Sequence, residues 1–237
     1  MIIKTFETVR PFILAVLLIL SASWLLLYLD NSNKGARNLP HIAIVQHASV
    51  AALEEGVEGM LQGLAKQGFV DGKTITVQKF NAQSDIATAN DIAAQVTNGS
   101  FDLIITSSTP SLQAVANKNA KAHVKHVYGV VTDAASSGVG VSKDDPLAHP
   151  PYMTGISSKI PVLRAIKIAL EANPQMDSIG LVWHNAEINS QIYTEDTRRA
   201  CSELGITLLE ATIDNSAGVG EAARSLVARG VDALFIT

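Results

Sequence analysis

Polar side chains follow several apolar, β-branched runs of the chain, at the points where predicted strands end. Gln46 and His47 follow one such run, Asp133 follows another, and Ser108 and Thr109 form a Ser-Thr-Pro turn before a predicted helix. A helix N-terminus presents free N–H groups and the positive end of a dipole, so this turn suits a carboxylate. An ordinary helix cap followed by proline is the simpler explanation of the turn.

Two further polar regions also have alternative explanations. Asp133 has no basic neighbour in the sequence, so it either binds a ligand ammonium or caps the glycine-rich turn after it. The segment HNAEINS at 184–190 is dense in polar groups, and its candidate ligand-binding residues are Asn185, Glu187, Asn189 and Ser190. A capping role for Asn189 or Ser190 in the next helix does not exclude a ligand contact.

Signatures of catalysis and of metal or cofactor binding are missing from the sequence. His47 and His184 stand at equivalent places in two similar segments, which suggests that they face each other across a cleft. Two histidines without a third ligand or a carboxylate at metal spacing do not form a zinc site. No Gly-x-Gly-x-x-Gly follows the first predicted strand, and neither a Walker loop nor a Gly-x-Ser-x-Gly elbow is present. We therefore predict a binding protein without cofactor or metal rather than an enzyme.

The composition fits a globular protein and argues against nucleic acid as a partner. Of the 237 residues, 47% are hydrophobic and 17% are charged, which is enough for one large core or two small ones. The net charge of −4 and the scattered lysines leave no basic stripe for a phosphate backbone. The single cysteine, Cys201, is expected to be a buried structural thiol.

From Pro40 onward, short β-rich runs alternate with helical patterns. Helices of ten or more residues between such runs indicate a parallel sheet with both faces covered. The predicted strands are 42–46, 74–80, 102–107 and 125–131, and the predicted helices are 50–67, 85–97 and 110–120. The candidate binding residues then lie beyond the carboxyl ends of the strands, where open α/β sheets bind their ligands.

The same order of elements recurs in the second half of the chain. IAIVQH at 42–47 resembles IGLVWH at 179–184, and NGSFDLIIT at 98–106 resembles ARGVDALFIT at 228–237. All α/β units share some features, but the common order favours a duplicated half-protein. We therefore predict two lobes.

These patterns divide the chain into four parts. Thr237 is equivalent to Thr106, inside a central strand, so we expect the second lobe to be truncated and the sequence to be a fragment of a longer protein. Residues 132–153 are rich in Gly, Ser, Asp and Pro and form the inter-lobe connection or a surface excursion beside it, and 154–158 is predicted to be a short strand. The predicted parts are 1–38 (N-terminal stub, anchor and linker), 39–135 (lobe 1), 136–153 (inter-lobe connection) and 154–237 (lobe 2).

An apolar run at 12–29 precedes the two lobes. As a helix its eighteen residues reach about 27 Å, just enough to span a hydrocarbon core, with Trp24 and Tyr28 near one end. A cleaved signal peptide is the alternative, but residues 30–38 offer no convincing cleavage site. We therefore predict an uncleaved single-pass anchor in the cell membrane, with the binding domain on the periplasmic or extracellular side.

Six segments stand in a characteristic order between about His41 and Thr237, namely GLAKQGFVDGKTITVQKFNAQSD, FDLIITSSTPSLQA, the VVTDA turn, the TGIS strand, the HNAEINS loop and SLVARGVDALFIT. In this order they resemble the ABC-transporter substrate-binding proteins of the tryptophan/tyrosine type. It implies the type I periplasmic-binding fold, in which two Rossmann-like α/β lobes with parallel sheets close on a small solute, often an amino acid. The residues that it implies face the ligand are Ser108, Thr109, Asp133, Glu187, Asn189 and Ser190.

The resemblance leads to two functional hypotheses. The first is an extracytoplasmic solute-binding protein of an ABC importer, which delivers a small solute to a permease. The second is the ligand-sensing ectodomain of a membrane signalling protein, with the same fold joined to a signalling module. An uncleaved anchor without a lipobox cysteine favours the second hypothesis more than usual. An enzyme on a similar scaffold is a weaker hypothesis, because no nucleophile–base pair is visible.

Overall fold

The computed structural model describes residues 16–24, 39–145 and 147–236. The chain divides into an N-terminal unit, Met1–Leu39, and a second unit, Pro40–Thr237. In the first unit, residues 16–24 are helical and exposed. Within the described residues, no helix has the length and apolar character needed to cross a membrane. The rest of the predicted anchor at 12–29 lies outside the described residues, so the anchor stays a prediction.

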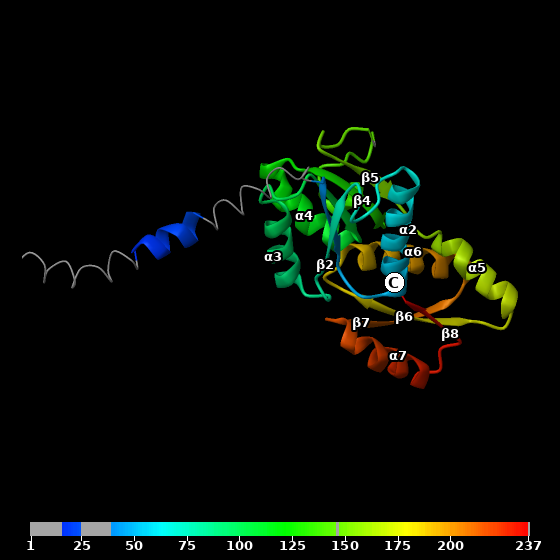
Figure 1. The fold of residues 1–237 in the computed structure, drawn as a ribbon. Coiled ribbons are helices and arrows are strands. Elements are labelled where there is room, and N and C mark those ends of the chain that lie inside the picture. The colour runs from blue at the N-terminus through cyan, green and yellow to red at the C-terminus, as the bar shows by residue number, and fades with distance from the viewer. Residues whose placement is uncertain (1–15, 25–38, 146, 237) are drawn as a thin grey trace, which may run out of the picture. The chain divides into compact units, whose positions relative to one another are not determined.

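The second unit begins with a five-stranded parallel sheet in the order β2-β1-β3-β4-β5, covered by helices (Figure 1). Its strands and helices begin and end within two residues of the predicted positions. They are β1 (His41–Gln46), α2 (Ala51–Lys66), β2 (Thr76–Asn81), α3 (Ile86–Val96), β3 (Leu103–Ser107), α4 (Thr109–Ala122), β4 (Lys125–Val131), the 3-10 helix η1 (Ala135–Ser137) and β5 (Met153–Ser157).

The central strands of this sheet are buried on both faces, which explains their continuous apolar runs. On one face Ala43 and Val45 of β1 pack into a core with α3 and α4. On the other face Ile42 and Ile44 pack against α2, together with Ile105 of β3. The alternation of side chains along each strand thus supplies two separate apolar layers.

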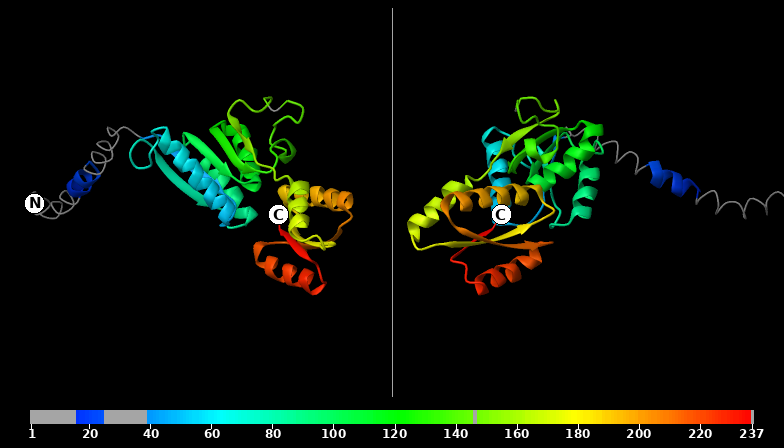
Figure 2. Two further views of the ribbon diagram at one scale, coloured as in Figure 1. Left: turned by 90° about the vertical axis from the view of Figure 1, so that its right-hand side faces the viewer. Right: turned by 180° about the vertical axis from the view of Figure 1, so that it is seen from behind.

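A second, three-stranded parallel sheet follows in the order β7-β6-β8. Figure 2 shows α5 and α6 on one face of this sheet and α7 on the other. The buried Cys201 belongs to the core beneath α5 and α6. The elements are α5 (Val162–Ala172), β6 (Ser178–His184), α6 (Ile188–Leu204), β7 (Thr207–Ile213), the 3-10 helix η2 (Ser216–Gly218), α7 (Val219–Ala228) and β8 (Ala233–Ile236).

The arrangement of the two sheets matches the repeat predicted from the sequence. In each sheet the first strand, β1 or β6, lies between the next two strands of the chain. The α/β fold with parallel sheets is therefore confirmed. The two copies also share a turn chemistry, because Asp102 accepts a hydrogen bond from the backbone N–H of His41, as Asp232 does from Ser178.

The strand β5 departs from the sequence-based division of the chain. The sequence places 154–158 at the start of the second lobe, whereas β5 pairs with β4 at the edge of the first sheet. Gly155 allows this pairing, since a Cβ there would stand 2.2 Å from the carbonyl oxygen of Tyr128. The chain therefore leaves the first sheet after β4 and returns to it at β5, so that the segment between these strands is an excursion from the first sheet, and the chain crosses to the second sheet at 158–161.

Candidate ligand-binding site

Several of the predicted site residues gather at the carboxyl edge of the first sheet. Gln46 is paired with Ser107 in the β1–β3 register, which places the loops after these two strands side by side. The backbone N–H of Ser108 donates to the carbonyl of Gly129 in β4, at 3.2 Å. The backbone N–H of Thr132 donates to Oγ1 of Thr109, also at 3.2 Å. The loops after β1, β3 and β4 therefore form one continuous rim.

The Ser-Thr-Pro turn caps α4 in the way that its simpler explanation predicts. Ser108 is the N-cap, and its Oγ accepts from the backbone N–H of Ser111 at 3.2 Å. Its φ of +120° lies in a region that few non-glycine residues adopt. Both hydroxyls are buried, with Ser108 5% and Thr109 2% exposed. Contact of these hydroxyls with a carboxylate stays a prediction.

Asp133 caps the turn that follows it, which is one of the two roles that the sequence left open. Its Oδ1 accepts from the backbone N–H of Ser136 at 3.2 Å, and its Oδ2 accepts from the Ser136 hydroxyl at 2.7 Å. Burial raises the pKa of Asp133, but the hydrogen bonds from Ser136 and the nearby charge of Lys159 outweigh burial and leave the pKa below its ordinary value. The carboxylate is therefore ionised and held in place over η1.

Val130 positions this rim and carries no signal in the sequence. It is a β-branched residue with a φ of +53°, at an irregularity where the β4–β5 register shifts between Tyr128 and Val131. Such a bulge re-aims the residues that follow it, here Thr132 and Asp133. Only the folded backbone reveals the bulge, because valine is among the residues least suited to this conformation.

Glu187 joins the rims of the two lobes. Its Oε1 lies 3.5 Å from Nε2 of His47, which follows β1 in the first lobe. Its Oε2 accepts from Nδ2 of Asn189 at 3.1 Å. The helices α4 and α6, one from each lobe, are also in contact. The structure thus brings His47, Glu187 and Asn189 together, a grouping that the sequence analysis did not predict.

The charge of Glu187 is stabilised within this cluster. The hydrogen bond from His47 holds the pKa of Glu187 below its ordinary value, while burial opposes the shift. The hydrogen bond from Asn189 and the charges of His47 and His184 lower the pKa further. A carboxylate is therefore kept ionised at the junction of the two lobes.

His184, the equivalent of His47 in the second lobe, bonds within its own lobe, and its facing of His47 across a cleft stays a prediction. Its Nε2 bonds with the carbonyl of Asp214 at 2.8 Å, and its Nδ1 accepts from the backbone N–H of Ala186 at 3.2 Å. Both ring nitrogens are thus used within the second lobe. Asn185 is exposed and Ser190 is buried, at the start of α6.

Four buried side-chain atoms of the described residues lack a hydrogen-bond partner within the protein. Two of them belong to the junction, namely Nδ1 of His47 and Oδ1 of Asn189. The others are Oγ of Ser107 and Nδ1 of His126. Buried polar groups are nearly always hydrogen-bonded in proteins, so the two junction atoms mark places for a ligand or water.

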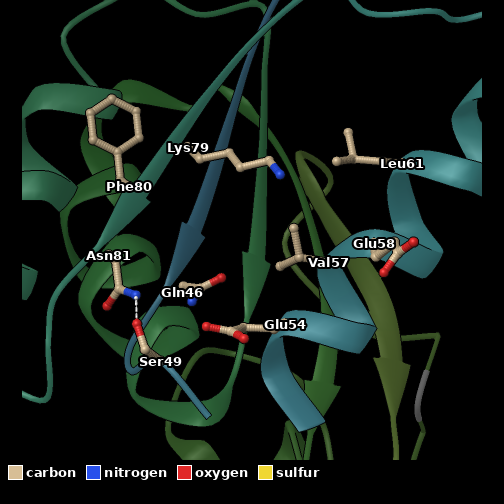
Figure 3. Close-up of a pocket in the computed structure, with 9 residues that line it drawn as sticks. All are labelled: Gln46, Ser49, Glu54, Val57, Glu58, Leu61, Lys79, Phe80 and Asn81. Atoms are coloured by element: carbon tan, nitrogen blue, oxygen red, sulfur yellow. Dashed lines mark hydrogen bonds between the residues drawn. The ribbon is translucent and has the colours of Figure 1, made fainter. Parts of the chain in front are cut away.

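A separate cavity of about 470 Å³ lies within the first lobe, between α2 and the strand β2 (Figure 3). In Figure 3 the side chain of Lys79 reaches from β2 toward Leu61 and Val57 of α2. At one end Nδ2 of Asn81 donates to Oγ of Ser49 at 2.9 Å. Gln46 is the one predicted site residue among those that line it. No group of three or more His, Cys, Asp or Glu side chains suited to a metal occurs in the described part of the chain.

The family of the chain agrees with this architecture. Residues 41–237 match the family described as ABC transporter substrate binding protein. The chain belongs to this family, which confirms the resemblance seen in its motifs. The family is one of binding proteins, in line with a chain that shows no catalytic signature.

Individual relatives match most of the chain. It is 26% identical over 207 residues to the tyrosine-binding protein of Clostridioides difficile (strain R20291), a match that covers 87% of this chain and 58% of that protein. The crystal structure of a conserved domain protein from Vibrio cholerae O1 biovar eltor matches with a TM-score of 0.74 and 28% identity, over 82% of this chain and 64% of that one.

The fold is shared with a ligand complex as well. An ABC domain from Streptococcus pneumonia in complex with L-Trp matches with a TM-score of 0.75 and 19% identity, over 84% of this chain and 65% of that one. This chain therefore spans 58% to 65% of the length of these three relatives.

Proposed function

We propose that this chain is the solute-binding component of an ABC importer and that its ligand is an aromatic α-amino acid. The observation that carries the proposal is the junction of His47 and Glu187, which joins the carboxyl-end rims of the two lobes. Ligands of open α/β sheets bind at such rims. The family, the tyrosine-binding relative and the relative in complex with L-Trp support an amino acid as the ligand.

The proposed mechanism is a shift of population between open and closed lobes. A ligand that touches both rims makes its full set of contacts only when the lobes are closed. Binding therefore favours the closed form by the difference in affinity between the two forms. The crossing segment at 158–161 is the place for such a movement. It is tied to α6 by the backbone N–H of Ile160, which donates to the Tyr193 hydroxyl at 3.2 Å.

The test is a thermal-shift screen of the twenty amino acids, followed by calorimetry with L-tyrosine and L-tryptophan. A ligand at 100 times its Kd stabilises the folded state by about 2.7 kcal/mol, which raises the melting temperature measurably. We expect the two aromatic L-amino acids to produce the largest shifts, and their D-enantiomers to produce none. Equal melting temperatures with and without every amino acid would contradict the proposal.

The sensory ectodomain is a second candidate, because the apolar run at 12–29 lacks a lipobox cysteine and a convincing cleavage site. We propose that the run anchors the binding lobes at the outer face of the cell membrane in either case. Mass spectrometry of the protein from cell membranes tests the anchor, since cleavage removes the N-terminal peptides. Co-purification separates the two functions, because an importer component brings down a permease.

A further inference from the structure

An exposed loop of the first lobe carries acidic and apolar side chains at its tip. It lies between β4 and β5, and its residues 142–145 and 147–149 are called the tip loop below. The side chain of Leu147 is 84% exposed, more than any other large apolar side chain in the described part of the chain. Asp144 and Asp145 are also exposed. The tip loop therefore presents one leucine close in sequence to two carboxylates.

Hydrogen bonds within the tip loop hold this arrangement in place. The Oγ of Ser142 accepts from the backbone N–H groups of Asp144 and Asp145, both at 3.2 Å. The backbone N–H of Leu147 donates to Oδ1 of Asp145 at 3.0 Å. The backbone N–H of Ser142 donates to the carbonyl of Ala148 at 2.9 Å, which closes the loop at its base. A loop that is braced in this way loses little conformational entropy when it binds a partner.

A cavity of about 590 Å³ lies in the second lobe, where the crossing segment at 158–161 meets α5 and α6. We call it the α5–α6 cavity. Its lining includes the apolar side chains of Ile160, Leu163 and Ala200, and Ile160 is 48% exposed. Cavities of this volume hold ligands larger than a single side chain. The α5–α6 cavity therefore has room for a leucine side chain.

The charged side chains of the α5–α6 cavity leave an excess of positive charge. Lys159 and Arg199 both pair with Asp196, with 2.7 Å between Nζ of Lys159 and Oδ2 of Asp196. Glu203, the other carboxylate of the lining, already has a lysine partner on α5. Arg164, in the first turn of α5, has no ion pair or side-chain hydrogen bond with another described residue. The cavity therefore suits a partner that brings carboxylates.

The tip loop and the α5–α6 cavity are complementary to each other. An apolar side chain near carboxylates matches an apolar cavity that is lined by cations as well. In both views of Figure 2 the loop between β4 and β5 lies apart from α5 and α6, so the two surfaces of one chain do not meet. We propose that the tip loop of one copy of this chain docks in the α5–α6 cavity of a second copy, with Leu147 inside the cavity.

This contact joins two different surfaces, so it is heterologous rather than two-fold symmetric. In a pair of copies, one tip loop and one cavity stay unused, and further copies can add at both ends. The two carboxylates of the tip loop outweigh Lys143, its one lysine, so ionic attraction contributes to the contact. Association should therefore weaken as the salt concentration rises.

The experiment measures self-association of the full chain by sedimentation velocity. The chain is held in lipid nanodiscs with one copy per disc, which keeps the apolar run at 12–29 in lipid. We expect the weight-average sedimentation coefficient to rise with protein concentration and to pass beyond the value of a dimer. Empty nanodiscs provide the baseline for association of the discs themselves.

Two variants each remove one side of the contact. Leu147→Ser should weaken association about tenfold or more, because the burial of a leucine side chain is lost. Arg164→Glu should have a similar effect, because it puts a negative charge where the acidic loop docks, and Arg164 has no side-chain partner within the described chain to lose. Ile168→Ser is the matched control, since it removes an exposed apolar side chain of α5 outside the cavity lining and should leave association unchanged.

A mixture of the two variants gives the sharpest test. The Leu147→Ser chain keeps an intact cavity, and the Arg164→Glu chain keeps an intact tip loop. Each variant alone should remain monomeric at concentrations where the wild-type chain associates. An equimolar mixture should form dimers and nothing larger, because one intact contact is restored and no further copy can add.

Several outcomes overturn the inference. A wild-type chain that stays monomeric at every concentration removes the second copy as the partner, and loss of permease co-purification in Leu147→Ser would then give the tip loop to the permease. A monomeric wild-type chain whose melting temperature rises with citrate, while that of Arg164→Glu does not, would make the cavity a small-anion site instead. A mixture that forms no dimer, or an equal loss in Ile168→Ser, also contradicts the docking.

Discussion

At the scale of single residues, the least expected side chain is His126, which lies in β4 and is 1% exposed. Its Nε2 bonds with Oγ1 of the equally buried Thr106 at 2.9 Å. Burial lowers its pKa from 6.5 to about 4, because a charged ring in the core would lose its hydration. The ring is therefore neutral in the folded protein over the whole range in which an unfolded histidine charges.

This neutral histidine predicts an acid-sensitive fold. Between pH 6.5 and pH 4, His126 is protonated in the unfolded chain but stays neutral in the folded protein. The free energy of unfolding therefore has its full value above pH 6.5 and falls as the pH decreases. At 1.36 kcal/mol per pKa unit, the loss amounts to about 3 kcal/mol. Urea unfolding at several pH values should show that, in the variant His126→Gln, the free energy of unfolding no longer falls by this amount between pH 6.5 and pH 4. His149→Gln, outside the core, should retain this decrease, and an unchanged slope in His126→Gln would contradict the explanation.

The sequence predicted the places of the site residues better than their partners. Gln46, Ser108, Thr109 and Asp133 were expected at strand ends, and parallel strands bring their carboxyl ends to one edge, so their gathering follows from the pattern. The pairing of His47 with Glu187 could not follow, because it depends on how the two lobes meet. The bulge at Val130 was also hidden, since its backbone conformation opposes the preference of valine.

At the scale of elements, helix α2 approaches β4 closely at Gly56. A Cβ on Gly56 would stand 2.6 Å from Cγ2 of Val130, whereas a Cβ on Gly59 would meet nothing within 4 Å. Both glycines lie in the interior of α2, where alanine is favoured by about 1 kcal/mol when space permits. The contact with Val130 therefore determines whether a glycine-to-alanine substitution in α2 lowers or raises the stability of the protein.

We therefore predict opposite effects from two matched substitutions. Gly56→Ala should destabilise the protein by about 1 to 3 kcal/mol, because the stiff valine beside it cannot move away cheaply. Gly59→Ala should stabilise it by up to about 1 kcal/mol. Chemical unfolding of both variants provides the comparison, and Val130→Ala should recover much of the loss in Gly56→Ala. A gain in stability from Gly56→Ala alone would rule out the close approach.

The elements also show where sequence patterns stop being informative. Strands such as β1 and β3 were predictable because burial on both faces demands continuous apolar runs. The five residues of β5 carry too short a pattern to say which sheet they join. Its place was decided by Gly155, whose missing side chain lets Tyr128 approach, and this contact is visible only in three dimensions.

At the scale of the whole molecule, the second unit contains its own cores. The four buried apolar clusters of the described residues draw on positions from Ile42 onward. Each lobe has a parallel sheet with helices packed on it, and none of these clusters includes a residue of the first unit, Met1–Leu39. Folding of the lobes is therefore expected to be independent of the N-terminal segment.

Deletion of residues 1–38 tests this independence. The free energy of unfolding of the shortened chain, measured in urea, should equal that of the full chain within about 0.5 kcal/mol, because no described core contact is removed. Its thermal shift with L-tryptophan should also be unchanged. The full chain held in detergent is the control, and a loss of cooperative unfolding in the shortened chain would refute the division into two units.

Cys201 gives the molecule one further property. It is the single cysteine of the chain, lies in the core of the second lobe and is 2% exposed. Burial raises the pKa of its thiol, so the reactive thiolate is scarce at neutral pH. Fluorophores can therefore be attached to cysteines introduced on the surfaces of the two lobes while the native thiol stays in place. Energy transfer between such dyes would follow the opening and closing of the lobes in real time.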